Sequence, residues 1–312
     1  MLKYKLLSAV LAISIICASC SNKNIVSPNR TDEKIEQSEH TAEIVDDPEN
    51  IQENEKKEYS AIVVLSPTDA EILYALGAQD KIIALGEFCS YPEEVSAKPK
   101  IATGEQTNIE QIISLNPDCV IMTTMAQEQS HAEKLKQAGI DVIISDSEST
   151  VDSSLDNIIK LGELVDKHDE AKKMTDDIRS GLNSIGEHVG EIEKMSVYVE
   201  ISPIQYGLWT CGNDTFQNEI MDYAMVNNSF NDVQGWQEIS QESVIERNPD
   251  VIITMLPGDD SINEIMGRKG WEHINAVANG EVYYFDQDLF TRGGPRMAEA
   301  AQELHKLIYK ID

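Results

Sequence analysis

The chain has 312 residues, enough for about two domains of roughly 150 residues each. Its 25 basic and 55 acidic residues give a formal net charge of −30 at pH 7. This balance argues against nucleic-acid binding, which needs a basic surface, and it offers little general attraction to a strongly anionic ligand.

The first 19 residues have the pattern of a lipoprotein signal peptide. Lys3 and Lys5 form a basic start, and residues 6–16 form an apolar segment that is too short to span a bilayer. The segment ends in Cys17-Ala18-Ser19-Cys20, in which small residues precede a cysteine. We expect cleavage before Cys20 and attachment of a lipid to its thiol. An ordinary secretory signal, cut nearby without lipidation, is the alternative.

Residues 20–59 are polar and acidic and have no apolar periodicity, so we expect the lipidated cysteine to be followed by a disordered tether. A lipid at Cys20 and a long tether predict an extracytoplasmic protein, anchored to the bacterial cell membrane but working in solvent.

Residues 60–150 alternate between apolar strands and amphipathic helices. We predict helices at 68–76, 108–115 and 127–138, and strands at 61–65, 81–85, 118–122 and 141–144. This spacing is typical of a mainly parallel sheet covered on both faces, and we take the segment as an N-terminal α/β lobe.

The next segment, residues 151–190, differs in pattern. It contains no proline, and its apolar residues recur three or four positions apart along one helical face. We expect one linking helix, on the order of 45–55 Å long. Two shorter helices are the alternative.

The α/β pattern returns in residues 191–312. We predict strands at 196–201, 251–255 and 281–285, and helices at 216–223, 241–247 and 295–309. These elements predict a C-terminal lobe with its own sheet.

One motif occurs in both lobes. Residues 108–122 read NIEQIISLNPDCVIM and residues 240–254 read SQESVIERNPDVIIT. Each copy predicts a short helix, an Asn-Pro-Asp turn and a buried strand. The repeat predicts two similar lobes with a cleft between them, and it places Glu110 and Glu242 at equivalent positions.

Outside the N-terminal segment the chain has three cysteines. Cys119 falls in an apolar strand and is expected in the core. Cys89 and Cys211 fall in loops and could pair or stay free. The six histidines form no close ligand pair, which argues against a bare metal site, and we expect no cofactor.

The ordered set of motifs after residue 60 resembles the periplasmic-binding-protein family for iron–siderophore complexes and vitamin B12, the extracytoplasmic receptors of ABC importers. The motifs are Leu65-Ser66-Pro67 with Glu71, Ser90-Tyr91-Pro92, Asn108-Ile109-Glu110, Asn116-Pro117-Asp118, Trp236 with Ser240-Gln241-Glu242, and Asp288 to Arg292 with Pro295-Arg296. The resemblance implies two α/β lobes, a rigid linking helix and a ligand cleft that closes only slightly. It also implies a monomeric binding protein without catalytic residues, which docks on an ABC permease dimer through Glu110 and Glu242.

We expect the ligand at the carboxyl ends of the strands, where open α/β sheets present their loops. Trp209 and Trp236 lie in segments that look irregular and contain glycine, and they offer broad rigid surfaces. Trp271 is expected in the core. The resemblance implies that Arg292 lies near the ligand with Asp288 four residues earlier; a plain surface pair of these two residues is the alternative. The ligand-binding candidates are Phe88, Tyr91, Tyr206, Trp209, Trp236, Asp288 and Arg292.

Arg292 is one of few basic residues in these loops, so a neutral or cationic hydroxamate-type iron complex fits better than an anionic catecholate. A corrinoid or haem is the alternative. In another class, a lipid-anchored hydrolase would use carboxylates such as Glu87, Glu105 and Asp288. A surface adhesion protein would have no closed cleft.

Overall fold

The computed structural model describes residues 57–123, 129–145, 149–187 and 193–311, all within one compact unit that spans residues 55–312. The predicted signal peptide, Cys20 and nearly all of the tether lie outside the described residues. No helix in the described ranges is long and apolar enough to cross a membrane.

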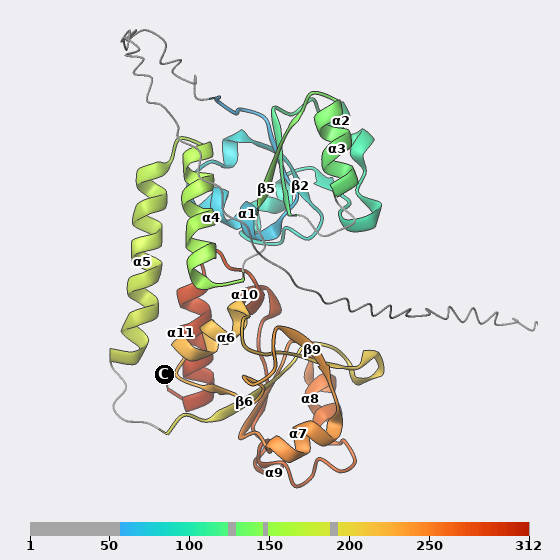
Figure 1. Ribbon diagram of the computed structural model, residues 1–312, viewed down its shortest axis with the longest axis vertical. Coiled ribbons are helices and arrows are strands. Elements are labelled where there is room, and N and C mark those ends of the chain that lie inside the picture. The colour runs from blue at the N-terminus through green and yellow to red at the C-terminus, as the bar shows by residue number, and fades with distance from the viewer. Residues whose placement is uncertain (1–56, 124–128, 146–148, 188–192, 312) are drawn as a thin grey trace, which may run out of the picture. The chain divides into compact units, whose positions relative to one another are not determined.

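The first lobe is a five-stranded, fully parallel sheet (Figure 1). Its strands follow the order β3-β2-β1-β4-β5. Their bounds are β1 (Ile62–Val64), β2 (Ile82–Gly86), β3 (Lys100–Ile101), β4 (Cys119–Thr123) and β5 (Asp141–Ser145), and the helices are α1 (Pro67–Ala75), α2 (Ile109–Ser114) and α3 (Gln129–Gln137). Every predicted element of this lobe is confirmed to within about two residues.

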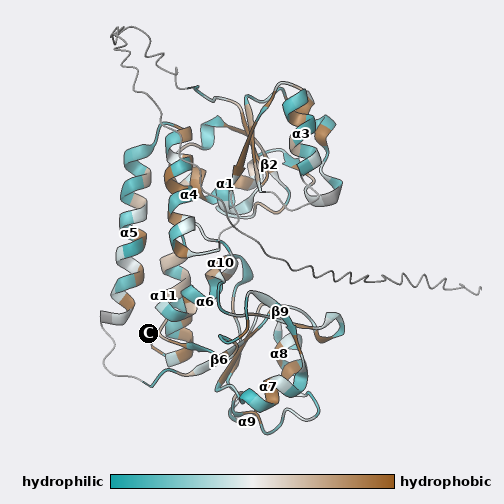
Figure 2. Cartoon of the chain, in the orientation of Figure 1, coloured by the Kyte–Doolittle hydropathy of each residue, from teal (hydrophilic) through white to brown (hydrophobic). Residues whose placement is uncertain are grey.

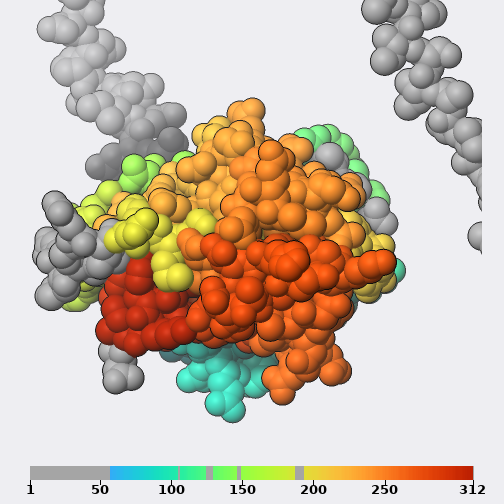
Figure 3. All heavy atoms as spheres, turned by 90° about the horizontal axis from the view of Figure 1, so that it is seen from below, coloured from blue at the N-terminus to red at the C-terminus, as the bar shows by residue number. Residues whose placement is uncertain are grey.

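The second lobe has a four-stranded parallel sheet of order β11-β10-β6-β8 and a separate antiparallel ribbon, β7-β9. The strands are β6 (Ser196–Glu200), β7 (Leu208–Cys211), β8 (Asn227–Asn228), β9 (Trp236–Ile239), β10 (Val251–Thr254) and β11 (Val282–Tyr284). The helices are α6 (Phe216–Tyr223), α7 (Gln241–Arg247), α8 (Asp259–Met266), α9 (Asn275–Asn279), α10 (Gln287–Thr291) and α11 (Met297–Tyr309). In Figure 3, α11 and the α7–α9 segment form one continuous surface. The predicted pair of α/β lobes with mainly parallel sheets is confirmed.

The expected single helix over the linking segment is wrong, and the alternative of two shorter helices is confirmed. Helix α4 (Val151–Leu164) ends at a turn in which Asp166 has a φ of 62° and the Lys167 amide donates to the Gly162 carbonyl at 2.7 Å. Helix α5 (His168–Glu187) then runs back beside α4 and packs also on α11 (Figure 1). Its 20 residues span about 30 Å. Helix α5 contacts α6 and α11 of the second lobe, and its neighbour α4 contacts α1 of the first.

A contiguous apolar core joins the two lobes on the side of these helices. It contains Ile62 and Val64 of β1, Ile158 of α4, Leu182 of α5 and Leu304 of α11. Two further cores fill the other face of each sheet, under α2 and α3 in the first lobe and around Trp271 in the second. In Figure 2 the strands of the first sheet are mostly hydrophobic, whereas most of α5 is hydrophilic.

The repeated Asn-Pro-Asp turn has a structural explanation. Asn116 and Asn248 adopt left-handed φ values of 49° and 47° at the ends of α2 and α7, a conformation that asparagine tolerates. The aspartate then accepts hydrogen bonds from the residue that precedes or begins the neighbouring strand. Asp118 Oδ2 accepts from the Ser60 amide at 2.7 Å, and Asp250 Oδ2 accepts from the Ser196 amide at 3.0 Å. The motif therefore fixes helix and sheet at the same place in both lobes.

Candidate functional site

All five predicted aromatic ligand residues are exposed, although residues of this kind usually pack inside. Their exposed fractions are 65% for Phe88, 47% for Tyr91, 75% for Tyr206, 37% for Trp209 and 38% for Trp236. In contrast, Trp271 is fully buried, as predicted.

The expectation that the two tryptophans lie in irregular segments is wrong, because both belong to the β7-β9 ribbon. In its register Trp209 lies opposite Glu238, and Cys211 lies opposite Trp236. Opposed residues and residues two apart share a face, so both indoles project from the same face of the ribbon. Leu208 and Ile239 belong to the other face and pack against the core of the second lobe. Neither LWTC nor WQEI alternates strictly between apolar and polar residues, so no two-residue period marked these strands in the sequence.

Phe88 and Tyr91 belong to a segment that we call the aromatic loop, residues 87–91, directly after β2. Cys89 anchors this loop, since its side chain is buried and its carbonyl accepts from Lys100 Nζ at 2.7 Å. With Cys89 directed inward, its neighbours Phe88 and Ser90 remain exposed. Tyr91 carries the guanidinium of Arg296 over its ring at 4.1 Å.

Arg292 lies between the lobes rather than on an open surface. Its side chain is only 10% exposed and its Nη1 donates to Glu71 Oε1 at 2.8 Å. The predicted neighbour Asp288 is also paired with it, at 2.6 Å. The alternative of a plain surface pair is therefore incomplete, because the main partner of Arg292 is a buried carboxylate of the other lobe. Glu71 was not among the predicted site residues, although a glutamate within the apolar run of α1 was a visible signal.

A second buried ion pair lies entirely within the C-terminal lobe. Arg268 donates to both carboxylate oxygens of Glu200, at 2.6 and 2.7 Å, and both side chains are buried. Burial, together with the nearby charge of Glu200, raises the pKa of Tyr198 well above its ordinary value. The chemistry of this pair is structural, because its groups satisfy one another inside the core.

Two of the three carboxylates considered for hydrolysis are already engaged by polar groups. Glu87 accepts from the Thr103 amide at 3.0 Å, and Asp288 accepts from Ser90 Oγ at 2.7 Å as well as from Arg292. The side chain of the third, Glu105, lies outside the described part of the structure. Within the described ranges, no cluster of His, Cys, Asp and Glu side chains is arranged to hold a metal ion.

Glu110 and Glu242 occupy the same position in the two lobes, the second residue of α2 and of α7. Asn108 and Ser240 cap these helices by accepting from the amides three residues on, at 3.0 and 3.1 Å. Both glutamates are exposed, and neither carboxylate has a hydrogen-bond or ion-pair partner in the part of the chain described. A carboxylate in the first turn is also favoured by the helix dipole.

The three cysteines of the lobes are free and buried, so Cys89 and Cys211 do not pair. Burial raises the pKa of Cys89 to about 11 and the pKa values of Cys119 and Cys211 to about 12. These thiols are consequently unreactive near neutral pH.

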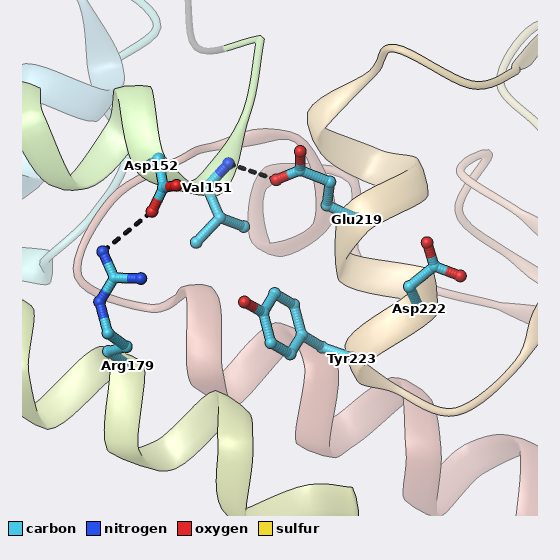
Figure 4. A pocket seen from close by; sticks show the side chains of 6 residues that line it. All are labelled: Val151, Asp152, Arg179, Glu219, Asp222 and Tyr223. Carbon is cyan, nitrogen blue, oxygen red and sulfur yellow. Dashed lines mark hydrogen bonds and ion pairs between the residues drawn. The ribbon is translucent and has the colours of Figure 1, made fainter.

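A separate cavity of about 390 Å³ lies among α4, α5 and α6 (Figure 4). Glu219 of α6 accepts there from the Val151 amide at 2.6 Å, so it caps the first turn of α4. Asp152 and Arg179 form an ion pair at 2.9 Å that ties α4 to α5. None of the predicted ligand residues lines this cavity.

Comparison with known proteins places these features in context. Residues 62–289 match the family described as periplasmic binding protein. An uncharacterized ABC transporter substrate-binding lipoprotein of Bacillus subtilis is 33% identical over 309 residues, which cover 97% of this chain and 96% of that protein. A vitamin B12-binding protein of Vibrio parahaemolyticus is 28% identical over 246 residues, which cover 78% of this chain and 87% of the relative.

A crystal structure of a possible iron-binding, periplasmic solute-binding protein from Staphylococcus epidermidis superposes with a TM-score of 0.73. The two proteins are 32% identical, and the match covers 81% of this chain and all of the other. The similarity therefore extends over both lobes.

Proposed function

This chain belongs to the periplasmic binding protein family, and from that premise we propose that it captures an iron–siderophore complex, with a hydroxamate type favoured, and delivers it to an ABC permease. The observation that carries the proposal is the set of five exposed aromatic side chains, of which two follow β2, one follows β6 and two lie on the β7-β9 ribbon. Aromatic faces bind a bulky apolar ligand shell at low entropic cost.

The charges around these residues support a neutral or cationic ligand. Glu87 and Glu238 are exposed beside the aromatic residues, and the charge of Arg292 is already balanced by Glu71 and Asp288. An anionic catecholate complex would find no free guanidinium at this place, and it would meet exposed carboxylates.

A corrinoid is the second candidate within the same class, and the vitamin B12-binding relatives favour it. Haem, another flat macrocycle, would use the same aromatic surfaces. The competing class, a lipid-anchored hydrolase, would require turnover of a substrate rather than stoichiometric binding.

A fluorescence titration tests the proposal. The protein is titrated with a ferric hydroxamate, a ferric catecholate, haem and cyanocobalamin while tryptophan emission is recorded. We expect saturable 1:1 quenching by the ferric hydroxamate and none by the catecholate. The matched control is the double variant Trp209→Phe, Trp236→Phe, which keeps only the buried Trp271 and therefore reports absorption by the ligand itself. Saturable binding of cyanocobalamin or haem alone would move the assignment to that ligand, and turnover in place of binding would reject it.

The same premise supports the mode of docking and anchoring. We propose that Glu110 and Glu242 contact basic residues of the permease, one from each lobe, because both are exposed and lack a partner within the described residues. We propose further that the protein acts as a monomer held at the membrane by a lipid on Cys20.

A further inference from the structure

A single buried carboxylate holds two arginines of the opposite lobe. Glu71 lies on α1 of the first lobe, and its side chain is only 1% exposed. Its Oε1 accepts from Arg292 Nη1 and from Arg296 Nη2, both at 2.8 Å, and its Oε2 accepts from Arg296 Nε at 2.9 Å. The two arginines flank the connection between α10 and α11 in the second lobe. These contacts join segments more than 200 residues apart.

The same arginines also hold the aromatic loop. Arg292 Nη2 donates to the Phe88 carbonyl at 3.3 Å and to Ser90 Oγ at 3.0 Å, while Ser90 Oγ donates to Asp288 at 2.7 Å. The guanidinium of Arg296 covers the ring of Tyr91. Each arginine therefore links Glu71 to a ligand candidate of the loop.

The backbone of the second lobe also approaches the first lobe closely beside this ion pair. A Cβ atom added to Gly294 would lie 3.4 Å from Thr68 Cγ2 on α1, so the α10–α11 connection already lies against the first lobe. Separating the lobes here would leave Glu71 without both of its cationic partners. A buried charge without a partner is costly, which makes this contact resist opening.

We propose that Glu71 is a positioning residue: it sets the spacing of the two lobes at α10 and fixes the aromatic loop through Arg292 and Arg296, without touching the ligand. Its effect on lobe spacing stands on the contacts alone, whereas its effect on ligand affinity rests on the proposed function. The role assigned to Arg292 changes accordingly, from a ligand contact to the link between Glu71 and the loop.

The chain offers a matched control for the test. Glu200 is as buried as Glu71 and also holds an arginine through both oxygens, but its partner Arg268 belongs to the same lobe. Glu71→Gln and Glu200→Gln each break a buried ion pair, and each should lower stability. Only the first should change how the lobes are held.

Hydrogen–deuterium exchange of the unliganded full chain is the readout. Three amides report on the contact, because those of Cys89, Phe290 and Gly294 donate to the carbonyls of Gly86, Asp286 and Arg292. We expect exchange at these amides to be at least about tenfold faster in Glu71→Gln, as for a contact weakened by about 1.4 kcal/mol, and unchanged in Glu200→Gln. Glu71→Asp, which keeps the charge, should recover part of the protection. Equal protection in wild type and Glu71→Gln, or the same loss in Glu200→Gln, would overturn the proposal.

Should Glu71→Gln not fold, Ser90→Ala serves instead, since Ser90 is exposed and its replacement removes its hydrogen bonds to Arg292 and Asp288 while Glu71 keeps both arginines. It should speed exchange at Cys89 and leave Phe290 unchanged; no change at Cys89 would contradict the proposal. Titration of Glu71→Gln with ferric hydroxamate and cyanocobalamin should show about tenfold weaker binding of whichever ligand binds the wild type. If neither binds the wild type, the proposed function fails while the exchange result still decides the role of Glu71.

Discussion

Trp236 shows at the scale of one residue how an exposed aromatic side chain becomes a binding candidate. Its ribbon turns Leu208 and Ile239 toward the core, which leaves Trp209 and Trp236 on the opposite face. An indole held on a paired strand loses little freedom on binding, so its surface is available at low entropic cost.

Replacement of Trp236 by alanine should weaken ligand binding by about 1–3 kcal/mol, the range of an aromatic anchor at an interface. The measurement is a calorimetric titration with the ligand identified by fluorescence. Ile245→Ala on α7 is the control, because Ile245 is exposed to a similar degree, at 40%, and is not a ligand candidate. Unaltered affinity of a folded Trp236→Ala protein would reduce Trp236 to a structural residue.

Asp69 is a residue whose ionisation affects stability. It is fully buried on α1, where Oδ1 accepts from Ser145 and Asn157, both at 2.9 Å, while Oδ2 has no partner in the described part of the chain. Burial raises the pKa of this carboxyl, more than its hydrogen bonds to Asn157 and Ser145 lower it. Folding therefore favours the protonated form.

The stability contributed by the proton on Asp69 is complete below the unfolded-state pKa of about 4 and is lost as the pH rises through the higher folded-state pKa. Asp69→Asn imitates the protonated form and should gain stability relative to the wild type as pH increases from 4. Melting temperatures of both proteins between pH 4 and pH 8 give the comparison. A difference that stays constant over this range would contradict the prediction.

At the scale of secondary structure, the repeated motif has two parts: one ends a helix beside its sheet, and the other exposes a glutamate. Its Asn-Pro-Asp part ends α2 and α7 and ties each to the neighbouring strand through Asp118 or Asp250. Its glutamate lies at the exposed start of the same helix. The turn thus holds each glutamate at a fixed place relative to its sheet, an arrangement suited to contacts with a partner.

Charge reversal tests these two helices as docking elements. Glu110→Arg and Glu242→Arg should each reduce transport in cells or coupled ATPase activity, because like charges would then face each other across the interface. Ligand affinity should stay within about twofold of the wild type, since surface changes away from the binding site cost little. Glu133→Arg, an exposed reversal on α3, controls for the loss of negative charge. Normal transport by both variants, or loss of ligand binding by a folded protein, would argue against docking at this position.

At the scale of the whole molecule, the lobes are held along one side and at one further point. The core shared by α4, α5 and α11 joins them along their length. The Glu71 contact joins them again at α10. Because this second contact requires paired buried charges, we expect the lobes to move little on ligand binding.

The anchor also belongs to the whole molecule. Cys20→Ala should abolish metabolic labelling with a fatty acid and release the protein from the membrane fraction, because no other cysteine follows small residues at the end of an apolar segment. Labelling and immunoblotting of membrane and soluble fractions measure both effects. Cys119→Ala is the control, since its buried thiol should not affect lipidation. Labelling that persists in Cys20→Ala would place the lipid elsewhere.

Much of the fold could be predicted because its signals are local. Apolar periodicity located most strands and helices of both lobes, and the repeat placed α2 with β4 and α7 with β10 in one register. The short elements β3, β8, α8, α9 and α10 were not predicted. The β7-β9 ribbon was missed because its short strands lie among glycines that resemble loop residues. The linking segment was misjudged because it contains no proline, although its apolar spacing is interrupted between Val165 and Met174, where only Ala171 is apolar and where the chain reverses at Asp166.

Local sequence patterns were enough to predict the two lobes and the residue types available for a ligand, since each of these depends on neighbouring residues. The pairing of Arg292, in contrast, emerged only from the tertiary fold. Its principal partner, Glu71, lies 221 residues away, and an arginine pairs with whichever carboxylate the fold brings within reach. The exposure of a side chain also depends on the fold. Trp236 and Trp271 have the same side chain, but packing leaves the first 38% exposed and buries the second.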